Sequence, residues 1–273
     1  MERNSAVNIS LLLPTRGRVP LVQRLFESLI WTTADLGTIE VVLYIDEDDH
    51  ESKEISHPAF SLFKVVGPAK ETMGNMNRAC YEASHGRYVI LMNDDVICHT
   101  KNWDLRVLEA CARFPDAIAL IYGNDLDQGK AVPTFPILSR TVCGVLGEIC
   151  PRGYLDLYID VHLLDIFKQL RRLGHDRILY LEDVVFEHMH HVVGKAALEI
   201  YHKKNHRADE ILFMALDDER ASKAQLLARY IEARCKEQAA CQIDSPISER
   251  RVFSEQKAGF RELLKRVFSF SDR

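Results

Sequence analysis

The chain has 273 residues, of which 47% are hydrophobic and 27% charged, and its formal net charge is -5 at pH 7. This composition is typical of a globular protein and excludes wholesale disorder, while the acidic balance argues against a binder of nucleic acid. Seven cysteines without a CxxC pair indicate reduced thiols rather than a disulfide framework. No apolar run reaches the ~20 residues that a membrane-spanning helix needs, so we expect a cytoplasmic chain, with peripheral contact at the inner face of a membrane left open.

In the first half of the chain, apolar runs rich in β-forming residues alternate with segments of helical periodicity. Strands are predicted at 8–14, 39–46, 62–68, 87–92 and 117–122, and helices at 20–33, 71–86 and 103–114. Near-continuous apolar strands separated by helices predict an α/β fold with a mostly parallel sheet that is covered on both faces.

The second half of the chain lacks this regular alternation of apolar strands and helical segments. Residues 123–140 are predicted to be loop-like, because two prolines interrupt the segment. An amphipathic helix follows at 158–174, and one or two short strands are expected within 177–191. From about residue 206 the chain becomes strongly helical, and 257–270 is a basic amphipathic piece. This last piece is compatible with an anionic membrane surface, with packing on the main domain, or with self-association into a homo-oligomer.

Polar residues end several of the predicted strands. Parallel strands present their carboxyl ends at one edge of a sheet, where ligands bind, and the residues expected there together are Thr15, Arg16, Asp46, Asp94 and Asp95. Asp94 and Asp95 repel each other, and burial of either carboxylate is costly unless a cation lies against it. The triplet Asn-Asp-Asp by itself is equally compatible with an exposed turn. A divalent ion would neutralise the carboxylates and a phosphate together, and carboxylate with imidazole suits Mn²⁺ or Mg²⁺ better than structural zinc.

Three segments in order, "NISLLLPTRGRVPLVQRLFESL", "VVLYID" and "MGNMNRACYEASHGRYVILMNDDV", resemble the N-terminal half of inverting glycosyltransferases of family 2. The resemblance implies a GT-A catalytic domain over 1–205, with a nucleotide-binding half (1–122) and an acceptor-binding half (123–205), and a helical extension over 206–273. It implies transfer of a sugar from a nucleoside-diphosphate donor, expected to be a UDP-sugar, to a hydroxyl of a glycan or lipid-linked glycan acceptor.

The same resemblance assigns roles by position. The residues implied in donor binding are Pro14, Thr15, Arg16, Asp46, Asn77, Asn93, Asp94 and Lys195. Among them Thr15 and Asp46 would hold the base, and Asp94 would approach the ribose. Asp95 and His188 would ligate Mn²⁺ or Mg²⁺ at the diphosphate, with His190 and His191 as alternatives to His188. Asn93 stands where the fuller family motif has its first aspartate, so the division of roles among residues 93–95 stays open.

In the acceptor half, the family places a catalytic aspartate at the start of a helix. Asp160 is therefore the candidate general base, with Asp156 and Asp165 as rivals, although Ile159 stands where the family often has a glutamate. Two other functions stay open. A sugar-phosphate nucleotidyltransferase also uses a strand-end aspartate on Mg²⁺. Such an enzyme normally has a glycine-rich, basic phosphate loop near its N-terminus, which "PTRGR" matches only weakly. A catalytically degenerate GT-A domain would bind a nucleotide or a partner without turnover.

Overall fold

The computed structural model describes residues 7–189 and 206–244. The chain divides into two compact units, Met1–Arg229 and Tyr230–Arg273, and the candidate active site lies within the first. The predicted roles of Lys195, His190 and His191 fall outside the described residues, as does the amphipathic piece at 257–270. Within the described ranges, no helix has both the length and the apolar character that crossing a bilayer requires.

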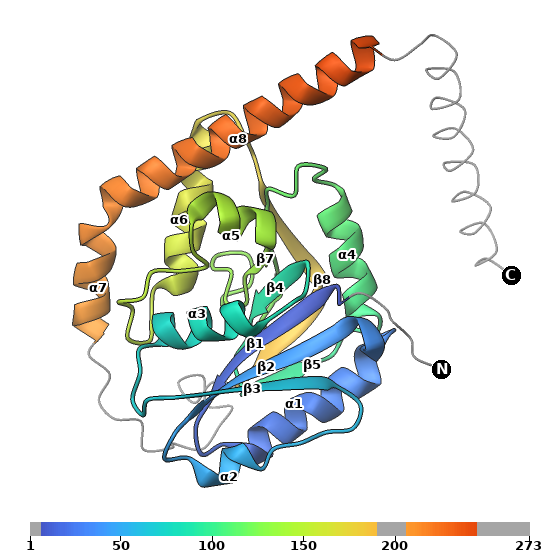
Figure 1. Ribbon diagram of the computed structural model, residues 1–273, viewed down its shortest axis with the longest axis vertical. Coiled ribbons are helices and arrows are strands. Elements are labelled where there is room, and N and C mark those ends of the chain that lie inside the picture. Colours follow the sequence, from blue (N-terminus) through green and yellow to red (C-terminus); the bar gives the residue numbers. More distant parts are fainter. Residues whose placement is uncertain (1–6, 190–205, 245–273) are drawn as a thin grey trace, which may run out of the picture. The chain divides into compact units, whose positions relative to one another are not determined.

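The described residues form one eight-stranded sheet with the strand order β3-β2-β1-β4-β7-β6-β8-β5 (Figure 1). Its strands are β1 Ile9–Thr15, β2 Ile39–Asp46, β3 Ser61–Gly67, β4 Tyr88–Leu91, β5 Val96–Cys98, β6 Leu120–Asn124, β7 Ile137–Ser139 and β8 Ile178–His188. Strand β1 pairs in parallel with β2 and β4, and β2 pairs in parallel with β3. Strand β7 runs antiparallel to both β4 and β6, and β5 runs antiparallel to β8. The sheet is thus parallel in its first half and mixed in its second.

Helices cover both faces of this sheet. They are α1 Val19–Thr32, α2 His50–Lys53, α3 Met73–Ala83, α4 Trp103–Ala112, α5 Arg140–Leu146, α6 Ile159–Arg172, α7 His206–Ala215 and α8 Asp217–Asp244, with a short 3-10 helix η1 at Leu36–Thr38. Helices α1 and α4 lie on one side of the sheet, and α3, α5 and α6 on the other (Figure 1). The core on the α1 side joins Phe26 of α1 and the fully buried Trp103 of α4 to alternate residues of β1 and β2, as the period of two in a strand requires.

The junction between α3 and β4 requires a glycine. A Cβ added at Gly86 would lie 2.4 Å from Oγ of Ser10 in β1, so no larger residue fits between the two strands. The buried Glu40 of β2 accepts hydrogen bonds from Ser10 Oγ at 2.6 Å and from the Gly86 amide at 3.1 Å. This contact fixes the start of β4 beside β1, and β4 in turn aims residues 93–95 at the rim of the sheet.

The structure differs from the sequence prediction in β5 and α5, which were not predicted, in β8, which is one strand of 11 residues rather than one or two short ones, and in two features of the sheet. The predicted loop at 123–140 ends in a regular element, because β7 begins directly after Pro136 and continues into α5. Strand β3 is not covered on both faces: Phe63 is 39% exposed and Val66 51% exposed, because β3 lies at the end of the strand order. The C-terminal region is helical over the described residues 206–244, as predicted.

Candidate active site

The carboxyl ends of β1 and β4 bring Thr15 and Asp94 together. Thr15 Oγ1 donates to Asp94 Oδ2 at 2.8 Å, and Arg18 Nη1 donates to Asp94 Oδ1 at 2.8 Å. Asp94 is only 3% exposed. Burial raises the pKa of the Asp94 carboxyl, against the charge and hydrogen bond of Arg18, which lower it. Asp94 thereby holds the Arg18 guanidinium and the Thr15 hydroxyl at the rim.

Arg18 is a site residue that the sequence reasoning missed. It is the N-cap residue of α1, and its side chain is 16% exposed where it meets Asp94. The only available signal was a second arginine in "PTRGR". A positive charge at this position partly compensates the two adjacent carboxylates at 94 and 95, because its field lowers the pKa of both.

Asp95 lies against His188 because of a strand pairing late in the sheet. Strand β5 begins directly after Asp95 and pairs antiparallel with β8, which places Val96 opposite His188. Nε2 of His188 lies 3.3 Å from Asp95 Oδ1, and Asn93 Nδ2 lies 3.4 Å from the same nitrogen. Burial alone would raise the pKa of Asp95, but His188 and Arg18 outweigh it and hold the pKa below its usual value.

The pair Asp95 and His188 fits a divalent cation. Asp95 Oδ1 is buried, and it lies 3.3 Å from Nε2 of His188, so a carboxylate oxygen and an imidazole nitrogen face each other. An oxygen and a nitrogen ligand suit Mn²⁺ or Mg²⁺. Within the described part of the chain, no cluster of three or more His, Cys, Asp or Glu side chains offers a complete site. An ion on two protein ligands needs water and substrate oxygens, as Mg²⁺ does in phosphate sites.

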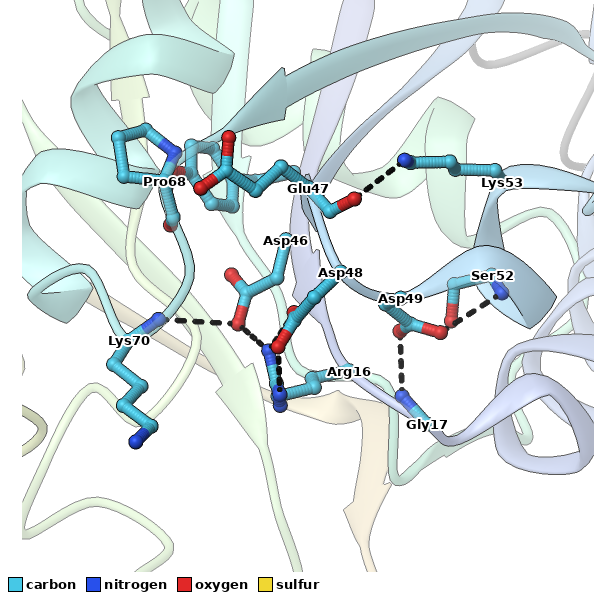
Figure 2. A network of polar contacts seen from close by, with 11 residues as sticks. Arg16, Gly17, Asp46, Glu47, Asp48, Asp49, Ser52, Lys53, Pro68 and Lys70 are labelled. Carbon is cyan, nitrogen blue, oxygen red and sulfur yellow. Dashed lines mark hydrogen bonds and ion pairs between the residues drawn. The ribbon is translucent and has the colours of Figure 1, made fainter.

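The end of β2 carries a second network, centred on Arg16 (Figure 2). Arg16 donates to Asp46 and, at 2.6 and 2.9 Å, to both carboxylate oxygens of Asp48. These hydrogen bonds raise the pKa of the guanidinium further and lower the pKa of the exposed Asp48. The Lys70 amide also donates to Asp46 Oδ2, at 3.3 Å. Asp46 is 3% exposed, and the side chain of Arg16, which pairs with it, is about half exposed.

Around this network the backbone is also held in place. The Gly17 amide donates to Asp49 Oδ2 at 2.7 Å, and Asp49 Oδ1 accepts from the Ser52 amide at the start of α2 (Figure 2). The acidic segment after β2 is therefore tied to the segment after β1, and Pro14 lies opposite Tyr44 in the β1–β2 register.

Asn77 has a different environment from the one expected. It is 4% exposed in α3, and its Nδ2 donates to the Met73 carbonyl of the same helix at 3.0 Å. Its Oδ1 is buried with no hydrogen-bond partner in the described ranges. The structure thus places Asn77 inside the helix–sheet packing rather than in a hydrogen bond at the rim.

The three candidate base carboxylates have different environments. Asp160 is half-buried in the first turn of α6, where its Oδ1 accepts the Val161 amide at 2.8 Å. Burial raises the pKa of Asp160 to about 6; Asp125 adds to the rise and the nearby His188 opposes it. Asp165 instead accepts from Arg220 at 2.7 Å and from Gln169 at 2.8 Å. Burial would raise the pKa of Asp165, but these donors hold it below its usual value.

Asp156, the third candidate, is half-buried in the turn before α6, and its amide is bound by Asp209. Asp160 therefore stands out as a carboxyl in the first turn of α6 whose pKa is raised by burial. A carboxylate of that basicity accepts a proton better than an ordinary aspartate does.

Asp125 was not singled out in the sequence. It is 2% exposed, and its Oδ1 accepts the amides of Asp127 at 3.1 Å and Gly129 at 2.8 Å. Its carbonyl accepts the His188 amide at 3.0 Å. The loop after β6 is thus folded around Asp125 and anchors the end of β8, which carries His188.

The structure has a sheet that is parallel over β1, β2 and β4, and its similarity to solved glycosyltransferases confirms the predicted GT-A fold. The structure is similar to TarS from S. aureus, with a TM-score of 0.55 and 15% identity over 82% of this chain. The chain spans less than half of that protein, 43% of its length. For TarS 1-349 in complex with UDP the TM-score is 0.55 at 15% identity, and the match covers 90% of this chain and 78% of that one.

Two further solved structures are similar. The mannosyltransferase PcManGT from Pyrobaculum calidifontis, in complex with GDP-Man and Mn²⁺, has a TM-score of 0.53 and 13% identity over 93% of this chain and 81% of its own. Glucosyl-3-phosphoglycerate synthase from Mycobacterium tuberculosis, in complex with Mn²⁺, UDP and phosphoglyceric acid, has a TM-score of 0.50 and 16% identity over 79% and 78%. Comparison with protein-family models and with curated protein sequences gives no match.

Proposed function

We propose that this protein is a metal-dependent inverting glycosyltransferase of the family 2 type. It transfers a sugar from a nucleoside-diphosphate donor, a UDP-sugar in the first instance, to a hydroxyl of a glycan or lipid-linked glycan. The observation that carries the proposal is the pairing of Asp95 with His188 on one side of the rim, together with the Asp160 carboxyl in the first turn of α6, whose pKa is raised by burial.

The similar structures support the choice of donor and ion. TarS 1-349 has been solved with UDP and with UDP-GlcNAc, PcManGT with GDP-Man and Mn²⁺, and the synthase with UDP and Mn²⁺. In this chain Asp95 and His188 would hold the ion, which stabilises the negative charge that grows on the diphosphate as the sugar leaves. Arg18, held by Asp94, adds a fixed positive charge on the same side.

The chain's own residues account for the remaining steps. Asp160 removes the proton from the acceptor hydroxyl as its oxygen attacks the anomeric carbon. The bond from that carbon to the diphosphate oxygen breaks, and its electron pair stays on the leaving diphosphate. Attack from the face opposite the nucleotide inverts the anomeric centre. Asp46 and Thr15 orient the base at the end of β1 and β2, and Arg16 moves from Asp46 to the donor when the donor binds.

A screen of donors tests this proposal directly. The thermal midpoint of the full chain is measured with UDP-, GDP- and dTDP-sugars, with and without Mn²⁺, because a ligand that binds only the folded state raises it. We expect stabilisation by a nucleotide sugar that depends on Mn²⁺, followed by transfer to a glycan acceptor with release of nucleoside diphosphate. Release of pyrophosphate from a nucleoside triphosphate and a sugar phosphate would instead identify a nucleotidyltransferase. Donor binding without turnover would identify a degenerate domain.

A further inference from the structure

The turn that precedes α6 is held from both sides by distant parts of the chain. Its carbonyl groups face α3: the amides of Met73 and Gly74 donate to the carbonyls of Leu155 at 3.1 Å and Tyr154 at 3.0 Å. This contact is close, since a Cβ added at Gly74 would lie 2.2 Å from the Pro151 carbonyl oxygen. The turn is therefore tied to the nucleotide-binding half through the first turn of α3.

The amide groups of the same turn face a single carboxylate. Asp209 of α7 accepts the Leu155 amide on Oδ1 at 2.7 Å, and the amides of Asp156 and Leu157 on Oδ2 at 3.0 and 2.9 Å. Asp209 is only 2% exposed. A carboxylate that accepts three amides makes charge-assisted hydrogen bonds, which are about twice as strong as neutral ones. The Asp209 carboxylate therefore binds three successive amides of the turn at once.

The residue that follows is strained and is held by the same helix. Tyr158 is the N-cap of α6 and has φ 70°, a left-handed conformation that is costly for a residue with a Cβ. Its ring packs on Phe213 of α7, with ring centroids 5.3 Å apart. The Arg220 guanidinium lies over Phe213, 3.9 Å from the ring centre, and binds Asp165 of α6. Such strain persists only where the surroundings enforce it.

We propose that Asp209 is the positioning residue for the general base: its carboxylate fixes the 155–158 turn, and the turn sets where α6 begins and hence where Asp160 stands relative to the donor. The proposal rests on the proposed function, in which Asp160 is the base. Asp209 does not touch the substrate. It acts through the backbone, because α3 and Asp209 together leave the turn one conformation, and a displacement of 1 Å at a reacting group costs about 10²-fold in rate.

The test compares Asp209→Asn with Asp104→Asn in the full chain with Mn²⁺ and the donor. Asp104 is a matched control: it is 1% exposed, and it accepts the amides of Ala34 at 2.9 Å and Asp35 at 3.2 Å on the α1–α4 side of the sheet. In Asp209→Asn we expect a fall in kcat of about tenfold or more, an unchanged KM for the donor, and faster hydrogen exchange at the amides of 155–157. Asp104→Asn should lower the thermal midpoint by about as much as Asp209→Asn does, but it should leave kcat unchanged.

A second variant covers the case in which Asp209→Asn does not fold. Phe213→Leu removes the ring contact to Tyr158 and should lower kcat in the same way, by a smaller factor. Wild-type exchange at 155–157, or faster exchange with wild-type kcat, would overturn the inference and leave the proposed function intact. Absence of sugar transfer by the wild-type chain would instead refute the proposed function, while the exchange data would still decide whether Asp209 fixes the turn.

Discussion

Replacement of Asp160 by asparagine should abolish sugar transfer and leave donor binding in place. The amide has nearly the shape of the carboxyl, so it keeps the hydrogen bond to the Val161 amide and loses only basicity. General-base catalysis contributes ~10²–10⁴-fold, which corresponds to about 3–5 kcal/mol in the activation barrier. We therefore expect kcat to fall by at least about a hundredfold, with the affinity for the nucleotide sugar unchanged.

The pH dependence gives a second measure of the same group. Burial raises the pKa of Asp160 to about 6, and the ionised form is the base, so kcat/KM should rise with pH through about 6 and level off above it. Below the pKa the rate should fall tenfold per pH unit, since kcat/KM follows the protonation of the free enzyme. In Asp160→Asn this limb of the profile should disappear.

The assay follows nucleoside diphosphate release with acceptor present, and donor affinity is measured separately by calorimetry. Asp165→Asn serves as the matched control, because Arg220 and Gln169 already occupy that carboxylate and its change affects stability rather than kcat. The reasoning is refuted if Asp156→Asn abolishes transfer while Asp160→Asn turns over like wild type.

Two further predictions concern the stability of the fold. His162 is fully buried, and burial lowers its pKa to about 3, below the value of ~6.5 in the unfolded chain. The unfolded state therefore binds the proton first as the pH falls. The free energy of unfolding should decrease below pH ~6.5 by ~1.4 kcal/mol per pH unit. Urea unfolding measures the loss of unfolding free energy between pH 7 and pH 5, and this loss should be ~2 kcal/mol smaller in His162→Leu than in wild type. The variant His50→Gln, which changes an exposed histidine, should show the full loss. Equal losses in all three proteins would contradict the assignment. Gly86→Ala should destabilise the fold by about 1–3 kcal/mol, because its Cβ would lie 2.4 Å from Ser10 Oγ. Gly144→Ala in α5, where nothing lies within 4 Å of a Cβ, should stabilise it by about 0.5–1 kcal/mol, and the same sign for both changes would refute the packing argument.

The main strands of the parallel half of the sheet could be predicted from the sequence, because the local apolar pattern and the burial in the fold agree there. Strand β2 begins and ends where its apolar run does, at Ile39–Asp46, since both of its faces are buried. Asp94 and Asp95 could be placed at a rim because they follow a strand of that kind. The short β7 after Pro136 was missed, because three residues between a proline and the first residue of a helix carry no periodicity.

The parts of the site that no local pattern in the sequence gives depend on contacts between distant segments, and they include the meeting of Asp95 with His188, which only the family resemblance implied. His188 meets Asp95 only through the pairing of β5 with β8, and the register of that pairing is not encoded locally. Arg18 reaches Asp94 across two strand ends. Asp209 binds amides that lie more than fifty positions earlier, and a single aspartate in an amphipathic helix gives no sign of such a partner.

The affinity of the chain for Mn²⁺ in the presence of UDP tests the central claim most directly. We expect Asp95→Asn and His188→Ala each to weaken Mn²⁺ binding by at least about tenfold and to remove metal-dependent turnover. The exposed Asp176→Asn, whose carboxylate pairs with Arg171, should bind Mn²⁺ as the wild type does. Wild-type Mn²⁺ affinity in Asp95→Asn would contradict the account, because the ion would then lie elsewhere than between Asp95, His188 and the donor diphosphate.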